Sequence, residues 1–157
     1  MHIAIGSDHA GWEIKEKIKV FLNQQGYVIL DYGTSSSESC DYPDFAIAVA
    51  RSVVAQQANL GILICGTGIG MAITANKIPG IRAAACVTET MAKFSKEHNN
   101  CNILCLGARL NTEEEMKNII SAWLKSQFEG GRHERRLNKI DALERECQNL
   151  SPLPRPT

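Results

Sequence analysis

Short runs of apolar and β-branched residues recur along the chain, separated by segments in which apolar residues return every three or four positions. Runs of this length are typical of strands buried on both faces of a sheet. The pattern predicts five strands, near residues 2–6, 27–31, 60–65, 81–87 and 102–107.

The intervening segments predict helices. The spacing is clearest after the first run, at Ile14, Ile18, Phe21 and Leu22, and after the fifth, at Met116, Ile119, Ile120, Trp123 and Leu124. Thr112 and Glu115 form a capping-box pattern, which predicts where the latter helix begins. Further helices are expected near residues 43–57, 70–77 and 88–98. This alternation predicts a parallel sheet with helices on both faces, a three-layer α/β sandwich.

A last helix is expected over residues 132–148, with an apolar stripe at Leu137, Ile140, Leu143 and Cys147. No strand follows it, so the stripe packs either on its own domain or on a second subunit. The proline-rich stretch 149–157 predicts an extended or disordered tail. Residues 1–148 are therefore expected to form a single domain.

Composition excludes several classes of protein. Seventeen basic residues balance seventeen acidic ones, so no global field draws the chain to nucleic acid or to an anionic membrane. The start of the sequence carries no pattern of a leader, and no apolar run approaches the ~20 residues that span a bilayer. We expect a cytoplasmic protein that binds neither nucleic acid nor membrane.

The six cysteines are expected to be reduced thiols. No Cys-x-x-Cys pair occurs, and a chain of 157 residues folds without disulfides. Cys101 and Cys105 are four apart, but their segment is predicted to be extended and nothing elsewhere completes a zinc set. We expect no metal site.

In a parallel sheet the ligand lies beyond the carboxyl ends of the strands, so the residues after each run are the informative ones. After the third run, Cys65 precedes Gly66, Gly68 and Gly70. This spacing fits neither the dinucleotide fingerprint nor a P-loop, and the arginine of a Cys-x5-Arg phosphatase loop is replaced by Met71. The amides of such a loop stabilise a thiolate and, with the Thr67 hydroxyl, an oxyanion. The alternative is that Cys65 is only a small buried residue.

Three arginines could bind an anion. Arg132 and Arg136 lie four apart in a predicted helix, so their guanidinium groups would share one face and fit a phosphate. Arg109 follows the fifth run and is a third candidate. A solvated surface pair is the alternative interpretation of Arg132 and Arg136.

Two polar pairs complete the candidates. His98 ends the predicted helix 88–98, where the helix dipole favours the imidazolium and would suit a proton donor, although a simple helix cap is the alternative. Asp8 and His9 follow the first run and are either part of a site or an N-cap with its neighbour. His2 and His133 receive no role.

Seven motifs in order, over residues 3 to about 145, resemble the type B ribose-5-phosphate isomerases of the ribose/galactose isomerase family. They are "GSDHAG", "DYPDFA", "ILICGTGIGMAITANK", "GIRAA", "EHNN", "LGAR" and "EGGRHERR". The resemblance implies a Rossmann-like α/β/α sandwich with a five-stranded parallel sheet. It also implies a homodimer or homotetramer with active sites where subunits meet.

The resemblance further implies roles for individual residues. Cys65 would be the base and His98 would help to open the furanose ring; one branch of the family uses a glutamate instead, but this chain carries the cysteine. The implied substrate-binding residues are Asp8, His9, Gly66, Thr67, Gly68, Ile69, Gly70, Asn99, Arg109, Arg132 and Arg136.

The expected reaction interconverts ribose 5-phosphate and ribulose 5-phosphate through a cis-enediol, which requires a base and oxyanion stabilisation but no cofactor. An allose 6-phosphate or galactose 6-phosphate isomerase is the alternative, and a non-catalytic phosphosugar-binding module is a third. Because one chain carries both the cysteine and the histidine, a self-sufficient homomer acting on ribose 5-phosphate is favoured.

Overall fold

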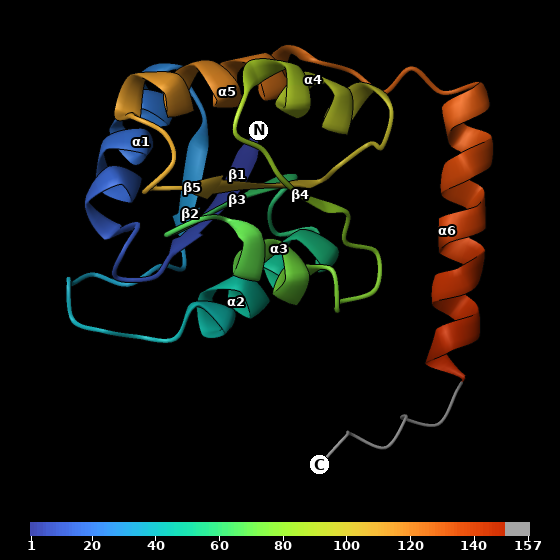
Figure 1. Ribbon diagram of the computed structural model, residues 1–157, viewed down its shortest axis with the longest axis horizontal. Helices are drawn as coiled ribbons and strands as arrows, with labels where there is room; N and C mark the ends of the chain where they lie inside the picture. The colour runs from blue at the N-terminus through green and yellow to red at the C-terminus, as the bar shows by residue number, and fades with distance from the viewer. Residues whose placement is uncertain (150–157) are drawn as a thin grey trace.

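The computed structural model describes residues 1–149, and in them five parallel strands alternate with helices (Figure 1). The strands are β1 (His2–Ser7), β2 (Val28–Asp31), β3 (Leu60–Cys65), β4 (Ala83–Ala85) and β5 (Ile103–Gly107). The helices are α1 (Trp12–Gln24), α2 (Tyr42–Val54), α3 (Ile69–Ala75), α4 (Glu89–Glu97), α5 (Glu113–Lys125) and α6 (Arg132–Gln148). The predicted tail lies outside the described residues, apart from Asn149.

The sheet separates two apolar cores, which makes the fold the predicted three-layer sandwich. Successive side chains of a strand point to opposite faces, so Ile3 and Ile5 belong to one core and Ala4 to the other. Helices α1, α4 and α5 cover the first face, and α2 and α3 cover the second (Figure 1). Burial on both faces explains why the strands show continuous apolar runs rather than alternation.

The strand order is β2-β1-β3-β5-β4, with every neighbouring pair parallel. The chain moves from β1 to one side of the sheet for β2 and then crosses to the other side for β3. A crevice therefore opens at the carboxyl ends of β1 and β3, where open α/β sheets bind their ligands. The predicted strand 81–87 is longer than β4, because only its middle pairs with β5 at the edge of the sheet.

The capping box that predicted the start of α5 is confirmed. Thr112 Oγ1 accepts a hydrogen bond from the Glu115 backbone N–H at 3.3 Å, and the Glu115 carboxylate accepts one from the Thr112 N–H at 2.7 Å. The two bonds satisfy amides that the helix itself leaves without partners, which fixes its first residue.

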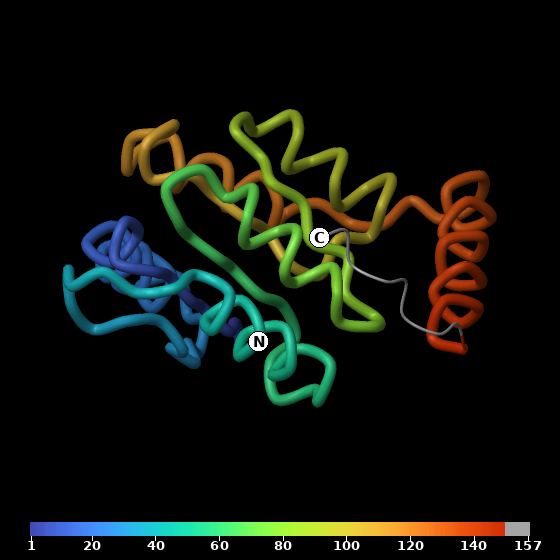
Figure 2. The backbone as a smooth tube through the Cα atoms, turned by 60° about the horizontal axis from the view of Figure 1, so that its bottom comes forward, coloured from blue at the N-terminus to red at the C-terminus, as the bar shows by residue number. Residues whose placement is uncertain are grey.

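Helix α6 stands to one side of the sandwich (Figures 1 and 2). It contacts its own domain through Leu137, which is buried, and through the Glu144 carboxylate, which accepts a hydrogen bond from the Gly80 N–H at 3.0 Å. Ile140 and Leu143 remain 51% and 58% exposed. The apolar stripe is thus only partly covered by its own domain.

Among the described residues, no helix has the length and apolar character needed to cross a bilayer.

Candidate active site

The loop after β3 holds the Cys65 thiol between the sheet and α3. The side chain is largely buried, at 5% exposure, and its Sγ accepts a hydrogen bond from the Gly68 N–H at 3.1 Å. Gly68 adopts φ +77°, and a Cβ there would lie 3.1 Å from the backbone of Leu106. Both facts require glycine, so the position that aims an amide at the sulfur accepts no side chain without strain.

The loop after β1 brings Asp8 and His9 to the same edge of the sheet. Asp8 Oδ1 accepts hydrogen bonds from the N–H groups of Ala10 and Gly11, at 3.0 and 3.2 Å. The N-cap of α1 is Gly11, so the interpretation of Asp8 as a helix N-cap was wrong: its side chain closes a turn before the helix.

His9 is oriented by the loop that precedes α2. Its Nδ1 accepts a hydrogen bond from the Cys40 N–H at 3.2 Å. The accepting nitrogen carries no proton, so the ring proton is on Nε2. His9 therefore offers a hydrogen-bond donor at the site.

These loops enclose a cleft of about 200 Å³ at the predicted position. It is lined by Asp8, His9, Ala10, Tyr42, Cys65, Gly66, Thr67, Gly70 and Arg109. The Arg109 guanidinium lies against the glycine loop, because a Cβ on Gly66 would be 3.2 Å from its Nη1. The Arg109 N–H also donates to the Gly66 carbonyl at 3.0 Å, which ties the loop after β5 to the thiol loop. A thiol, an imidazole donor and a guanidinium thus share one small cleft with a carboxylate.

Tyr42 was given no role by the sequence reasoning. It is the first residue of α2, and a Cβ on Gly70 would lie 2.6 Å from its ring. The ring thus closes the cleft over the start of α3. The position of Tyr42 in the segment after the second predicted strand could have indicated a role at the ligand edge. An aromatic residue at such a position is equally typical of core packing.

Ile69 follows Gly68 in the thiol loop as the first residue of α3, but the other predicted residues lie elsewhere. Helix α4 runs back from the carboxyl edge of the sheet, so His98 at its C-terminus lies near the amino edge, where Asn102 precedes β5. The five residues of β5 alone span about 16 Å between the two edges. Asn99 lines the groove between β4 and α6 rather than the thiol cleft.

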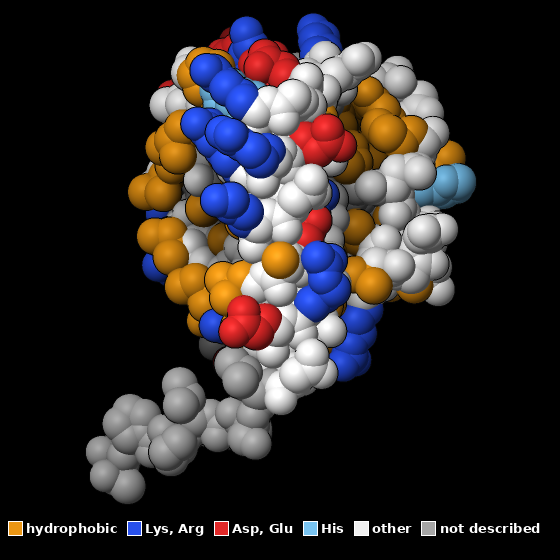
Figure 3. Space-filling view, turned by 90° about the vertical axis from the view of Figure 1, so that its right-hand side faces the viewer, with side chains coloured by type: hydrophobic (Ala, Val, Ile, Leu, Met, Phe, Trp, Pro, Cys, Tyr) orange, Lys and Arg blue, Asp and Glu red, His pale blue; other side chains and the backbone are white. Residues whose placement is uncertain are grey.

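Arg132 and Arg136 belong to the same second cluster as His98. Both are exposed in the first turns of α6, and the Glu129 N–H before that helix donates to the Glu97 carbonyl at the end of α4, at 3.0 Å. Basic side chains line this end of the helix (Figure 3). Within one chain the predicted site is therefore divided into a thiol half and a histidine–arginine half.

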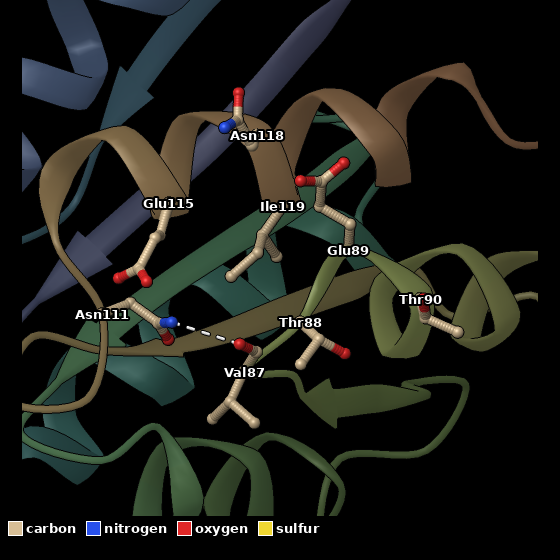
Figure 4. Close-up of a pocket in the computed structure, with 8 residues that line it drawn as sticks. All are labelled: Val87, Thr88, Glu89, Thr90, Asn111, Glu115, Asn118 and Ile119. Carbon is tan, nitrogen blue, oxygen red and sulfur yellow. Dashed lines mark hydrogen bonds between the residues drawn. The ribbon is translucent and has the colours of Figure 1, made fainter.

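A larger cleft, of about 440 Å³, lies between the starts of α4 and α5 (Figure 4). The Asn111 amide donates to the Val87 carbonyl at 3.1 Å in its floor, and the carboxylates of Glu89 and Glu115 flank it. None of its described lining residues is basic. Two carboxylates without a cation repel an anionic ligand, so the smaller thiol cleft is the better candidate for a phosphorylated one.

Fold and site together define a class: a Rossmann-like α/β protein with a thiol, an imidazole and a guanidinium at the topological switch point of its sheet. The chain belongs to the ribose/galactose isomerase family, whose model matches residues 3–140. It is 46% identical over 142 residues to ribose-5-phosphate isomerase B of Escherichia coli, covering 90% of this chain and 95% of that protein.

Solved structures agree with this assignment. A ribose-5-phosphate isomerase B from Clostridium thermocellum superimposes with a TM-score of 0.92 at 48% identity, over 94% of this chain and 99% of that one. A ribose-5-phosphate isomerase B from Mycoplasma genitalium, solved with bound ribulose-5-phosphate, gives a TM-score of 0.89 at 43% identity, over 92% and 97% of the two chains.

Proposed function

We propose that the protein interconverts ribose 5-phosphate and ribulose 5-phosphate, with Cys65 as the base. The observation that carries the proposal is the 3.1 Å hydrogen bond from the Gly68 N–H to Cys65 Sγ, inside a cleft that also contains His9 and Arg109. An N–H donor stabilises a sulfur anion, and a thiolate rather than a thiol is the reactive base. The relatives named above as ribose-5-phosphate isomerases support the choice of substrate.

The chemistry follows from the contents of the cleft. The Cys65 thiolate removes the proton from C2 of the open-chain aldose, and the electrons of that C–H bond move to form the enediolate. The loop amides and the Thr67 hydroxyl stabilise the negative oxygen. A proton passes from O2 to O1 of the enediolate, and the thiol then returns its proton to C1 as the C2=O bond forms, which yields the ketose. His9 and Arg109 supply donors for the anionic groups of the substrate.

The histidine–arginine half of a site comes from a second copy of the chain. His98, Arg132 and Arg136 lie too far from Cys65 of the same chain to act on one sugar, whereas a two-fold partner can present them to the open side of the cleft. Exposed apolar side chains on α3 and α4 favour such an interface: Ile69, Ile73, Met91 and Phe94 are 56%, 58%, 45% and 44% exposed. A homodimer is the smallest assembly with complete sites, and a homotetramer would contain two such dimers.

In the complete site, His98 of the second copy gives a proton to the ring oxygen as the furanose opens. Arg132 and Arg136 of that copy bind the phosphate with Arg109 of the first. The guanidinium groups fix the distance between the phosphate and the thiolate, which selects the length of the sugar.

The test is direct turnover of purified protein, followed by 13C NMR of ribose 5-phosphate and, separately, allose 6-phosphate, with EDTA present throughout. We expect rapid conversion of ribose 5-phosphate and slower conversion of allose 6-phosphate. Preference for allose 6-phosphate would assign a six-carbon substrate instead. Binding of both sugars without conversion of either would contradict an enzymatic role.

A further inference from the structure

Three flat rings are stacked at the junction of α4 and α6. The rings of Phe94 and His98 are 4.6 Å apart between centroids and inclined by 15°, and those of His98 and His133 are 4.2 Å apart and inclined by 4°. Two rings this close and this parallel to one imidazole would collide if they shared a face. Phe94 and His133 therefore cover opposite faces of His98.

His133 differs from its neighbours in being buried. It is 5% exposed, whereas Arg132 and Arg136 on either side of it are exposed. Its N–H donates to the Gly130 carbonyl at 3.1 Å, and the Glu129 N–H donates to the Glu97 carbonyl at 3.0 Å. These bonds hold the start of α6 against the end of α4. The fold thus places the His133 ring under His98 with little freedom to move.

Groups of opposite charge lie at Nε2 of His133. Arg132 Nε is 3.4 Å from this nitrogen and the Glu129 carboxylate is 3.6 Å from it. Burial lowers the pKa of His133, and the nearby His98, Arg132 and Arg136 lower it further, while the Glu129 carboxylate opposes them. These four are the charged or titratable groups that face it.

Two stacked imidazolium ions 4.2 Å apart would repel each other, which also favours a neutral His133 ring. The Glu129 carboxylate lies 4.0 Å from Nε2 of His98 and 3.6 Å from Nε2 of His133. The stack fixes the plane of the His98 ring between Phe94 and His133, as a positioned proton donor requires.

We propose that His133 is a positioning residue: its buried ring holds the His98 ring flat against Phe94. This inference rests on the proposed function, in which His98 protonates the ring oxygen of the sugar. His133 itself does not touch the substrate. Its contribution is the orientation of the residue that does.

The same cluster has the spacing of a metal site. One ligating atom each of His98, Glu129 and His133 lie within 4.8 Å of one another. The guanidinium of Arg132 already occupies His133 Nε2, and Arg136 adds a second positive charge on the same helix. Two guanidinium groups oppose a divalent cation, so the cluster suits a proton donor better than a metal ion.

Two substitutions separate stacking from titration. His133→Asn removes the flat ring, whereas His133→Phe keeps a flat ring that cannot take a proton. Turnover of ribose 5-phosphate requires ring opening, but exchange of the C1 hydrogen of ribulose 5-phosphate with D2O requires only the thiolate and the enediol. Glu134→Gln, an exposed change in the same turn, is the matched control.

We expect His133→Asn to lower turnover of ribose 5-phosphate about tenfold or more while C1 exchange changes less than about twofold. His133→Phe should restore most of the lost turnover. By NMR, the ring signals of His98 should move in His133→Asn, which loses the stacked ring, and should change less in His133→Phe. Glu134→Gln should match the parent in all three measurements.

Three results would overturn the inference. The first is unchanged turnover in His133→Asn, and the second is an equal loss of turnover in His133→Asn and His133→Phe. The third is loss of C1 exchange in His133→Asn together with a lower melting temperature, which would make His133 merely structural. Saturable Zn2+ binding that shifts the ring signals of both histidines would assign a metal site instead. The NMR signals are measured without turnover, so a protein inactive on both sugars would contradict the proposed function and would still test whether His133 holds the His98 ring.

Discussion

At the scale of single residues, Cys65 differs from the other thiols in what its sulfur touches. Burial raises the pKa of Cys86, Cys101 and Cys105, that of Cys101 to about 11, which leaves these thiols neutral and inert near neutral pH. Cys65 instead accepts an N–H hydrogen bond and borders a cleft. All six cysteines are free, as the sequence predicted.

Removing this sulfur tests its role as the base. Cys65→Ala should lower isomerisation by a factor of about 10³ or more, because it removes the proposed base. The affinity for ribose 5-phosphate, measured by calorimetry, should change little, since the arginines and His9 remain. Cys147→Ser, which alters an exposed thiol on α6, is the control. Turnover of Cys65→Ala within about tenfold of the parent would exclude Cys65 as the base.

Some residues of the candidate site could be predicted from the sequence, and others could not. Cys65, Gly68 and Arg109 could be found because the ends of parallel strands meet at one edge whatever the details of packing. The role of His133 could not, because its stacking on His98 depends on how α6 returns to α4. The sequence could not show whether the Asp8 side chain closes a turn or caps a helix, because both interactions use the same side-chain oxygen.

At the scale of elements, the strands were predictable because each buries both faces and so shows an uninterrupted apolar run. Helices α1 and α5 were predictable from their apolar stripes, and α5 also from its cap. The length of β4 was overestimated most, since only Ala83–Ala85 of the predicted strand 81–87 pair with β5. The division of the site could not be predicted, because helical spacing does not reveal which edge of the sheet a helix end reaches.

The loop between β3 and α3 makes a testable element. Gly68→Ala forces a side chain into φ +77° and against the backbone of β5, which should lower the free energy of unfolding by about 1–3 kcal/mol and misalign the amide at Cys65. Turnover should fall by much more than the loss of folded protein explains. Urea unfolding and turnover measure the two effects.

Gly26→Ala provides the matched control for that loop. Gly26 has φ +84°, but a Cβ there would meet no atom within 4 Å. The control should therefore lose stability from its backbone conformation alone and keep full activity. Equal losses of activity in the two variants would contradict the role assigned to the Gly68 amide.

The contact between α4 and α6 should weaken in acid. Burial lowers the pKa of His133 in the folded chain, whereas in the unfolded chain it returns toward 6.5. Below pH 6.5 the unfolded state therefore binds more protons than the folded state. The stabilisation of the fold by neutral His133 is complete above pH 6.5 and is lost as the pH falls below that value. Melting temperatures at pH 7.5 and 5.5 should differ less in His133→Phe than in the parent. An identical pH dependence would show that His133 is not held neutral.

At the scale of the whole molecule, one chain carries two halves of a site at opposite edges of its sheet. The thiol half lies at the carboxyl ends of β1 and β3, and the histidine–arginine half lies where α4 ends and α6 begins. Ile140 and Leu143 of the α6 stripe and the exposed apolar residues of α3 and α4 remain uncovered in the single chain. A symmetric partner accounts for both facts at once.

The central claim is that Cys65 of one copy works with His98 of another, and subunit complementation measures it most directly. Cys65→Ala and His98→Asn are each expected to lose turnover of ribose 5-phosphate, and refolding them together should create mixed dimers with one intact site. Random assortment predicts recovery of about a quarter of the parent activity. Activity no higher than the mean of the two separate variants, with mixed dimers verified by mass spectrometry, would contradict a site shared between chains.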